Sequence, residues 1–436
     1  MRIFTLIWLG QLVSTLGSYM TFFALTLWAW DATGSATALA LVGFFSQLLK
    51  IPTTIFAGLI VDRFNRKYLM LLGDVVSVAG TVIIGALHIT QQLQIKHLYG
   101  IVFLVGGFSQ IQMLAYQASV SLMVTKRHYT RTGSMVSVVH YGSSIVGPAL
   151  AGGLYPRIGL TGIIVIDLIT FAVAIVTLLL APIPQPPIPQ PPIPQPPISQ
   201  IKPSQPERLT SQLTFGFRQI WQQPSLKALL LVTVLFTFAH DLGGALHSPM
   251  ILARTNGSAQ ALASVSAMAG IGGVVGAVVV SIWGGPKQRI QGVLGGYIGA
   301  GLCKTVFGLG QSLTIWLPAQ VCSSLNFPLL SSARSALWME HVTPAAQGRV
   351  FAANSLVIQS ASALAVLLAG PLADRLLEPA MMPGGTLVRW TAFVFGSGPG
   401  AGMAVLYVGC ALAMVLIGIG GFLLPQLKAF APDTSA

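Results

Sequence analysis

Charged residues crowd one short segment between two long apolar runs. In the segment 58–70, GLIVDRFNRKYLM, one acid and three cations share a short turn at the end of an apolar run. A carboxylate in such a place can pair with the cations or cap the positive N-terminus of a neighbouring helix. Because such contacts form in one conformation and break in another, we predict a conformational gate made of Gly58, Asp62, Arg63, Arg66 and Lys67.

A second group of candidates consists of ionisable residues inside the apolar runs. Asp241 stands in the middle of one run, in TFAHDLGGALHSPM, next to His240. A charge at the centre of a bilayer costs about 3 kcal/mol or more, so Asp241 is the first candidate for a proton or substrate site. Lys50 and Lys304 are its conceivable partners, although a buried pair can also serve structure alone. Polar positions in the first two runs that can meet a substrate are Gln11, Ser14 and Gln47.

Two further acids in apolar runs are expected to be structural. Asp74 lies near the start of its run, where a carboxylate stabilises the positive end of a helix. Asp167 is expected to hydrogen-bond to a neighbouring helix.

The sequence lacks the residue patterns that ATP hydrolysis, metal binding or enzymatic catalysis would need. The chain has no GxxxxGK[ST] loop, which argues against direct use of ATP. Its three cysteines show no metal or disulfide spacing, and its seven histidines are spread over different runs. We therefore expect no metal site, no cofactor and no enzymatic activity.

Apolar runs recur over the whole chain and must position these residues. Of the 436 residues, 54% are hydrophobic and 8% are charged, and the mean hydropathy is +0.77. Soluble domains carry roughly 25% charged residues, and a membrane-spanning helix needs about 20 apolar residues. The pattern predicts an all-α integral membrane protein with twelve transmembrane helices, at 3–30, 36–61, 68–89, 98–124, 134–156, 160–181, 226–250, 258–283, 290–310, 312–337, 349–375 and 401–424.

The charge distribution gives these helices an orientation. The net charge is +13, and sixteen of the 23 Lys and Arg residues fall on the side of the N-terminus, against five on the opposite side. Basic residues collect on the cytoplasmic side of membrane proteins. We expect both termini in the cytoplasm, the helices in a plasma membrane among lipids, and no nucleic-acid partner. No cleavage site follows the first apolar run, so we expect that helix to be retained.

The chain also shows an internal repeat. Three landmarks recur at an offset of 223 residues: Gly147-Pro148 with Gly370-Pro371, Arg66 with Arg289, and Lys126 with Arg349. This offset indicates parallel duplication of a six-helix unit. The predicted units are a first six-helix bundle, a cytoplasmic linker with a surface helix, a second six-helix bundle and a cytoplasmic tail, at 1–181, 182–225, 226–424 and 425–436.

The linker between the halves is rich in proline. Residues 183–197 hold three copies of the unit IPQPP, which favours an extended polyproline II rod of about 45 Å. Such a rod is a spacer between the two bundles or, alternatively, a docking site for a proline-reading partner domain. The following segment, 207–224, reads as an amphipathic helix on the membrane surface, with Leu209, Leu213, Phe217 and Ile220 on one stripe.

Glycine and proline cluster in the fifth run, HYGSSIVGPALAGGLY. Small residues let membrane helices pack closely, and proline adds a kink. We predict a functional motif made of Gly142, Gly147, Pro148 and Gly152, with close helix packing as the alternative.

The segment 58–70 resembles the G-x-x-x-D-R-x-G-R-[RK] loop of the major facilitator superfamily. Asn65 replaces the usual glycine, and we expect it to adopt the left-handed turn that asparagine tolerates. The second-half equivalent, GGPKQR at 284–289, has no acid. The first run and the segment PAAQGRVFAANSLVIQSASALAVLLAGPLAD resemble the drug-exporter branch that includes macrolide-efflux proteins and enterobactin exporters. The glycine motif is similar to an antiporter signature of the superfamily.

The resemblance implies two six-helix bundles around a central cavity that opens alternately to each side of the membrane. It also implies export, driven by inward flow of protons. We therefore expect a proton antiporter that exports amphipathic small molecules of the drug, macrolide or siderophore kind. The alternatives are uptake or facilitated transport of a solute or lipid and, more remotely, a membrane sensor or scaffold that transports nothing.

Overall fold

The computed structural model describes residues 2–124, 129–182 and 209–430. The IPQPP repeat and the basic residues Lys126 and Arg127 lie outside these ranges, so the linker predictions stay predictions. All regular elements in the described ranges are helices, and none is a strand. The all-α fold class expected from the sequence is therefore confirmed.

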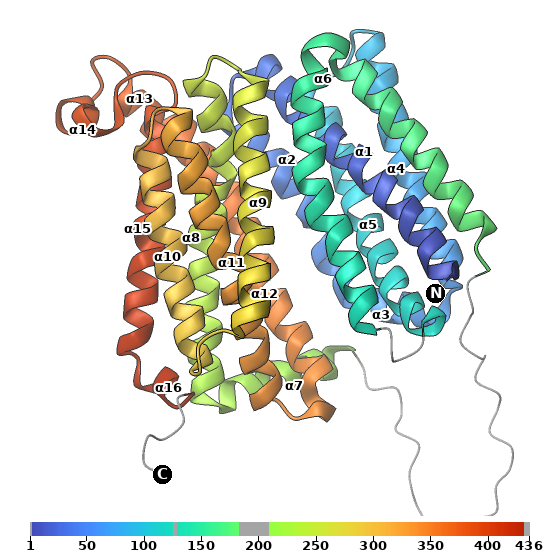
Figure 1. Cartoon of the computed structure of the whole chain (residues 1–436). Helices are drawn as coiled ribbons and strands as arrows, with labels where there is room; N and C mark the ends of the chain where they lie inside the picture. Colours follow the sequence, from blue (N-terminus) through green and yellow to red (C-terminus); the bar gives the residue numbers. More distant parts are fainter. Residues whose placement is uncertain (1, 125–128, 183–208, 431–436) are drawn as a thin grey trace, which may run out of the picture.

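The first half of the chain forms one bundle of helices (Figure 1). Its second span is broken at Leu49 into two consecutive helices. The elements are α1 (Arg2–Thr33), α2 (Ala36–Leu48), α3 (Lys50–Arg63), α4 (Arg66–Ile89), α5 (Ile95–Met123) and α6 (Tyr129–Leu180).

The second half forms the other bundle, which the short helix α7 precedes and an irregular segment before the last span interrupts. The long elements are α7 (Leu209–Gln222), α8 (Pro224–Arg254), α9 (Ala259–Trp283), α10 (Arg289–Leu309), α11 (Leu313–His341), α12 (Pro344–Pro371) and α15 (Ala401–Leu423). The short ones are the π-helical turn Leu372–Leu377, α13 (Glu378–Met381), α14 (Val388–Phe395) and α16 (Pro425–Lys428).

Two of the helices decide the number of membrane passes. By length and hydropathy, ten helices of the described chain can cross a membrane. With 52 residues, α6 would be about 78 Å long if straight, far more than a hydrocarbon core of about 30 Å. It turns back at Gly159 (φ 61°, ψ −169°) and makes two passes. The 29-residue α11, which carries Pro318 and Pro328, packs along α9 and α10. The architecture is thus the twelve-span fold expected from the sequence.

Short polar residues set where several of these helices begin. The Ser35 side chain accepts a hydrogen bond from the backbone N–H of Ala38, 3.2 Å away, at the start of α2. Ser258 does the same for α9. Such N-caps satisfy backbone donors that have no partner within the helix. The far end of α9 is set by Gly284, whose φ of 78° favours glycine.

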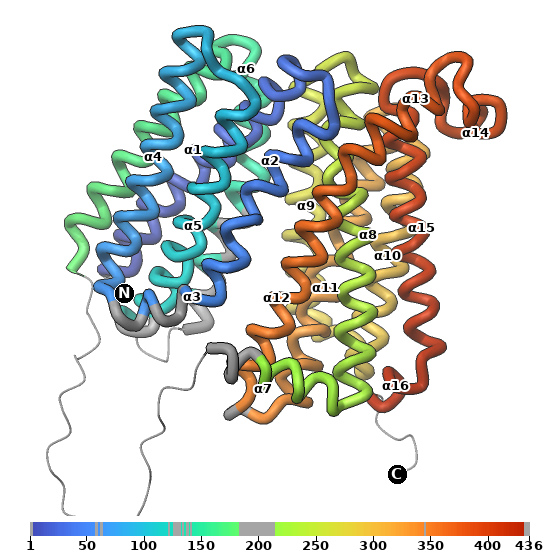
Figure 2. The backbone as a smooth tube through the Cα atoms, turned by 180° about the vertical axis from the view of Figure 1, so that it is seen from behind, coloured from blue at the N-terminus to red at the C-terminus, as the bar shows by residue number. Residues whose placement is uncertain are grey.

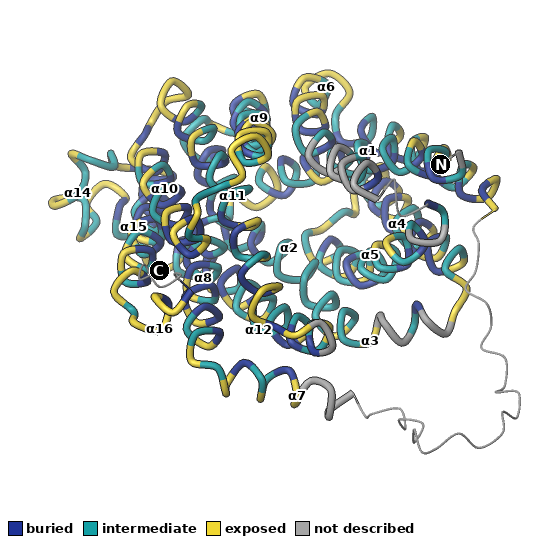
Figure 3. The backbone as a smooth tube through the Cα atoms, turned by 60° about the horizontal axis from the view of Figure 1, so that its bottom comes forward, coloured by how far each residue is buried: buried dark blue, intermediate teal, exposed yellow. Residues whose placement is uncertain are grey.

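The two bundles meet at one end of the molecule and diverge at the other (Figures 1 and 2). We name the end where α1 begins, α7 lies and α15 ends the linker face, and the opposite end, where α6 turns and α13 and α14 lie, the far face. Across the junction, α2 packs on α12 and α6 packs on α9. Buried residues gather inside each bundle, while exposed ones cover its outside (Figure 3).

The apolar cores follow the same division. One core includes Ala36 and Ala151 of the first bundle together with Ala263 and Ala369 of the second, so it is continuous across the junction. Two other cores lie toward the linker face, one in each bundle. Of these three cores, only the one on the far-face side joins the two bundles through apolar contacts.

Glycine positions within the second bundle give a direct test of its packing. A Cβ at Gly272 of α9 would overlap the backbone carbonyl of Val321 in α11, whereas a Cβ at Gly273 would meet no atom within 4 Å. We expect Gly272→Ala to destabilise the protein by about 1–3 kcal/mol, the usual cost of overpacking. Gly273→Ala is its matched control and should be neutral or stabilising, because alanine favours helix. Thermal unfolding in detergent compares them; equal transition temperatures would contradict this packing.

Candidate functional site

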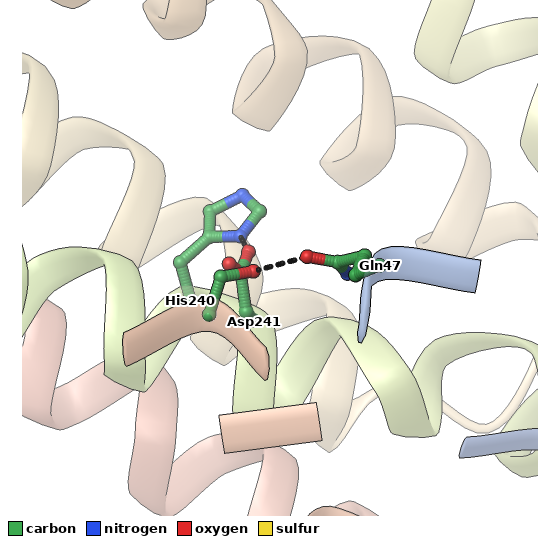
Figure 4. Close-up of polar contacts among 4 residues, drawn as sticks. Gln47, His240 and Asp241 are labelled. Atoms are coloured by element: carbon green, nitrogen blue, oxygen red, sulfur yellow. Dashed lines mark hydrogen bonds and ion pairs between the residues drawn. The ribbon is translucent and has the colours of Figure 1, made fainter. Parts of the chain in front are cut away.

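The residues best placed to bind a proton or substrate lie on α8 where it faces α2 and α12. The Nδ1 atom of His240 is 3.0 Å from Oδ1 of Asp241, and the two side chains are 26% and 25% exposed. Ser362 of α12 lies beside Asp241, and its hydroxyl donates to Oε1 of Gln47 at 3.2 Å. Figure 4 shows Gln47 reaching this group from α2, so the site joins both bundles.

A buried cation compensates the carboxylate. Lys304 of α10 is only 9% exposed and lies within electrostatic range of Asp241, without a direct ion pair between the two described side chains. Its Nζ atom also lies 5.4 Å from the centre of the Tyr407 ring. A buried charge in a membrane is tolerated when an opposite charge and aromatic faces surround it. Loss of either charge would leave the other uncompensated.

Aromatic rings surround this polar group. Phe236 stacks on Tyr297 with ring centres 3.8 Å apart, and His240 meets the edge of Phe327 at 4.9 Å. Further along α8, His247 stacks on Phe307 at 5.1 Å. An acid and a base beside aromatic surfaces suit a ligand with one polar and one apolar part. The arrangement offers no metal site, since no group of three or more His, Cys, Asp or Glu in the described ranges is arranged to hold one.

The other residues predicted for this site lie elsewhere. Lys50 is the first residue of α3, directly after the break in the second span. Gln11 is partly buried in α1. Among the described contacts, neither residue joins the cluster of His240, Asp241 and Lys304. Of the seven residues predicted as proton or substrate candidates, the structure therefore brings together His240, Asp241, Lys304 and Gln47.

The cations of the predicted gate bind backbone carbonyls of their own bundle. Arg66 donates to the carbonyl of Ala118 in α5 at 2.7 Å. The ammonium of Lys67 donates to the carbonyls of Leu179 and Ala181, at 2.8 and 2.9 Å, where the second half of α6 ends. These are favourable positions for a cation, since the last carbonyls of a helix carry partial negative charge.

The remaining gate residues, Gly58, Asp62 and Arg63, belong to α3 but their side chains lie outside the described part of the structure. Their roles stay predictions. The expectation for Asn65 is wrong: its φ is −62° and its ψ is 119°, so it is extended rather than left-handed. Its side chain accepts from the backbone N–H of Lys67 at 2.9 Å and caps α4, which explains how this loop forms without the usual glycine.

The glycine motif of α6 serves two different contacts. A Cβ at Gly147 would meet Tyr19 of α1, within the first bundle. A Cβ at Gly152 would overlap Ala263 of α9, across the junction. Pro148 lies inside the same helix, and Gly142 has open space where its Cβ would be. Close packing therefore accounts for Gly147 and Gly152, and only Gly152 lies between the bundles.

Sequence reasoning missed three residues that connect helices. Ser362 bridges the site, Asp374 binds the start of α2, and Glu378 binds the start of α15. The serine carries no signal in a chain rich in small residues. The two acids could have been recognised from sequence, because acids are rare in this chain. Both follow the apolar part of the eleventh span, four residues apart.

Comparisons with known proteins agree with the architecture. The family model described as Major Facilitator Superfamily matches residues 7–366. The chain is 24% identical over 397 residues to macrolide efflux protein A of Streptococcus pyogenes, which covers 90% of this chain and 94% of that protein.

Solved transporter structures share the fold at low identity. The nucleoside transporter NupG aligns with a TM-score of 0.72 at 9% identity, covering 96% of this chain and 100% of that one. A bacterial homologue of the iron transporter ferroportin in an inward-facing state aligns with a TM-score of 0.65 at 14% identity, covering 96% and 98%. The family match spans most of the chain, and the chain therefore belongs to the Major Facilitator Superfamily and is a multi-pass membrane transporter, not an enzyme.

Proposed function

We propose that this transporter exports amphipathic small molecules, of the drug, macrolide or siderophore kind, in exchange for protons. The observation that carries the proposal is the group of His240, Asp241 and Lys304, part-buried among aromatic rings at the junction of the two bundles. Similarity to macrolide efflux protein A supports the direction and the substrate class.

Asp241 is the exchange site in this proposal. Its carboxylate accepts either a proton or the polar part of a substrate, and one displaces the other. The neighbouring His240 holds the carboxylate in place, while Lys304 compensates its charge when neither ligand is bound. Competition of two ligands for one site couples their movements in opposite directions.

Movement of the bundles then carries the ligands across the membrane. The shared core and the α2–α12 and α6–α9 contacts close the far face, while the cores near the linker face are separate. If the basic linker face is cytoplasmic, as the positive-inside rule requires, this arrangement opens inward. The segment with Asp62, Arg63, Arg66 and Lys67 would close the linker face in the outward-open form.

Gly152 provides a test of this rearrangement. Gly152→Val places a side chain where Ala263 lies, and we expect it to prevent closure of the far face and to lower transport about tenfold or more. The adjacent Gly153 has open space at its Cβ, so Gly153→Val is the matched control and should transport normally. The reaction of a cysteine introduced at Gln92, between α4 and α5 on the far face, with a membrane-impermeant maleimide reports the opening. If Gly152→Val transports like Gly153→Val, closure at this contact is not needed.

The direction of transport separates export from the alternative of uptake or facilitated transport. In everted vesicles an exporter accumulates labelled substrate, whereas an uptake system accumulates it in right-side-out vesicles. Concentration of an erythromycin-type macrolide inside everted vesicles would support the proposal. Movement that only equalises the two sides, or accumulation in right-side-out vesicles alone, would favour the alternative.

A further inference from the structure

An acid at the end of the eleventh span binds the backbone of the opposite bundle. The Asp374 carboxylate accepts three hydrogen bonds from the start of α2: from the hydroxyl of Ser35 at 2.6 Å, from the N–H of Ala36 at 3.2 Å and from the N–H of Thr37 at 2.8 Å. We name these three bonds the inter-bundle cap. They lie on the far face, where α12 ends beside the beginning of α2 (Figure 2).

The helices touch closely on one side of the inter-bundle cap. A Cβ at Gly370, one turn before Asp374, would overlap the backbone of Thr37. Asp374 itself lies in the π-helical turn Leu372–Leu377, a rare backbone form that is frequent at functional sites. The far face therefore cannot open at this point while the three bonds persist.

A second acid in the same stretch makes the same kind of bond without crossing the junction. The Glu378 carboxylate accepts from the N–H of Gly400 at 3.2 Å and from the N–H of Met403 at 2.9 Å, at the start of α15. Both α15 and Glu378 belong to the second bundle. Two carboxylates four residues apart thus cap two helices, and only Asp374 links parts that must separate.

Water can replace these bonds when the face opens. A pocket of about 530 Å³ lies between the bundles here, lined by Trp30 and Ser35 from the first and by Asp374 and Met403 from the second. A carboxylate at a helix N-terminus is held by charge-assisted bonds and by the helix dipole. Because both partners are near solvent, such a cap can hold one conformation and still open in each transport cycle.

We propose that the inter-bundle cap is the closing contact of the far face and that Asp374 is its positioning residue. This inference rests on the proposed alternating access. The cap lies at the far-face end of the packing of α2 and α3 against α12, and the predicted gate follows in sequence at the end of α3. Opening of the far face at the cap and closing of the linker face at the gate can then occur in one movement of the bundles.

Distances across the far face test the cap directly. Nitroxide labels are placed at Gln92→Cys, between α4 and α5, and at Ser312→Cys, before α11, after Cys303, Cys322 and Cys410 are replaced by alanine. In the full-length protein without substrate, Asp374→Asn should raise the population with the long distance about tenfold or more, because it removes the charge that the α2 N-terminus binds. Ser35→Ala, which removes one bond, should shift it less in the same direction.

Glu378→Gln is the matched control and should leave the population within about twofold of the wild type, since its helix cap lies within one bundle. Size-exclusion profiles and circular dichroism verify folding. The cap is overturned if Asp374→Asn and Ser35→Ala both keep the wild-type distances, or if Glu378→Gln opens the face as far as Asp374→Asn. Transport is measured separately in vesicles. If Asp374→Asn opens the far face but the wild type exports no substrate, the cap is supported and only the proposed function is refuted.

Discussion

Replacing Asp241 with asparagine should reduce substrate accumulation in everted vesicles at least about tenfold, equivalent to a barrier about 1.4 kcal/mol higher. The amide keeps the shape of the side chain but cannot exchange a proton in the physiological range. It also leaves the buried Lys304 without the carboxylate that compensates its charge. The coupled step is therefore lost, although the helix can still form.

The control for this variant is Asp31→Asn. Asp31 is an exposed acid at the far-face end of α1, away from the group around Asp241. Its loss removes the same charge and should leave accumulation near the wild-type level. Retention of most of the accumulation by Asp241→Asn, with normal amounts of folded protein, would exclude Asp241 as the exchange site.

Asp62→Asn should lower transport about tenfold while leaving folding largely intact. Asp62 belongs to the last turn of α3, and its carboxylate is predicted to close the linker face in one state only. Since Arg66 and Lys67 already bind backbone carbonyls of their own bundle, the loop keeps its position without the acid. The variant should therefore fold and bind substrate but complete few cycles.

A suitable control is Glu340→Gln, on the same face of the second bundle. Glu340 pairs with Arg289 at 2.8 Å, and both side chains are nearly half exposed, so this surface ion pair contributes little. Thermal unfolding and transport are compared for both variants. Wild-type transport by Asp62→Asn, or an equal loss in Glu340→Gln, would contradict the gate.

The fold could be predicted from the sequence because hydropathy and helix-breaking residues determine locally where each span begins and ends. The break between the predicted fifth and sixth spans corresponds to the turn at Gly159, and the amphipathic segment 207–224 corresponds to α7. Where a side chain points was not accessible in this way. Asp74 was expected at a helix start, yet it lies in the third turn of α4 and accepts a hydrogen bond from Gln112 of α5 at 2.5 Å.

Long-range pairing explains what the sequence did not predict. The contacts of Ser362 with Gln47 and of Asp374 with Ser35 join residues more than 300 positions apart. No spacing rule connects residues on two bundles, because their register is set by the packing of whole helices. His240 and Asp241 were found together only because they are neighbours in the chain, and Lys304 because a charge is rare in an apolar helix.

The most direct test of proton exchange is proton movement in everted vesicles with an acidic interior. Macrolides, lipophilic cations and siderophores are added in turn, and internal pH and substrate accumulation are recorded together. The account predicts that at least one compound accumulates while protons leave the vesicle, and that Asp241→Asn abolishes both signals. Accumulation of a substrate by the wild type without proton release, or proton release that persists in Asp241→Asn, would contradict it.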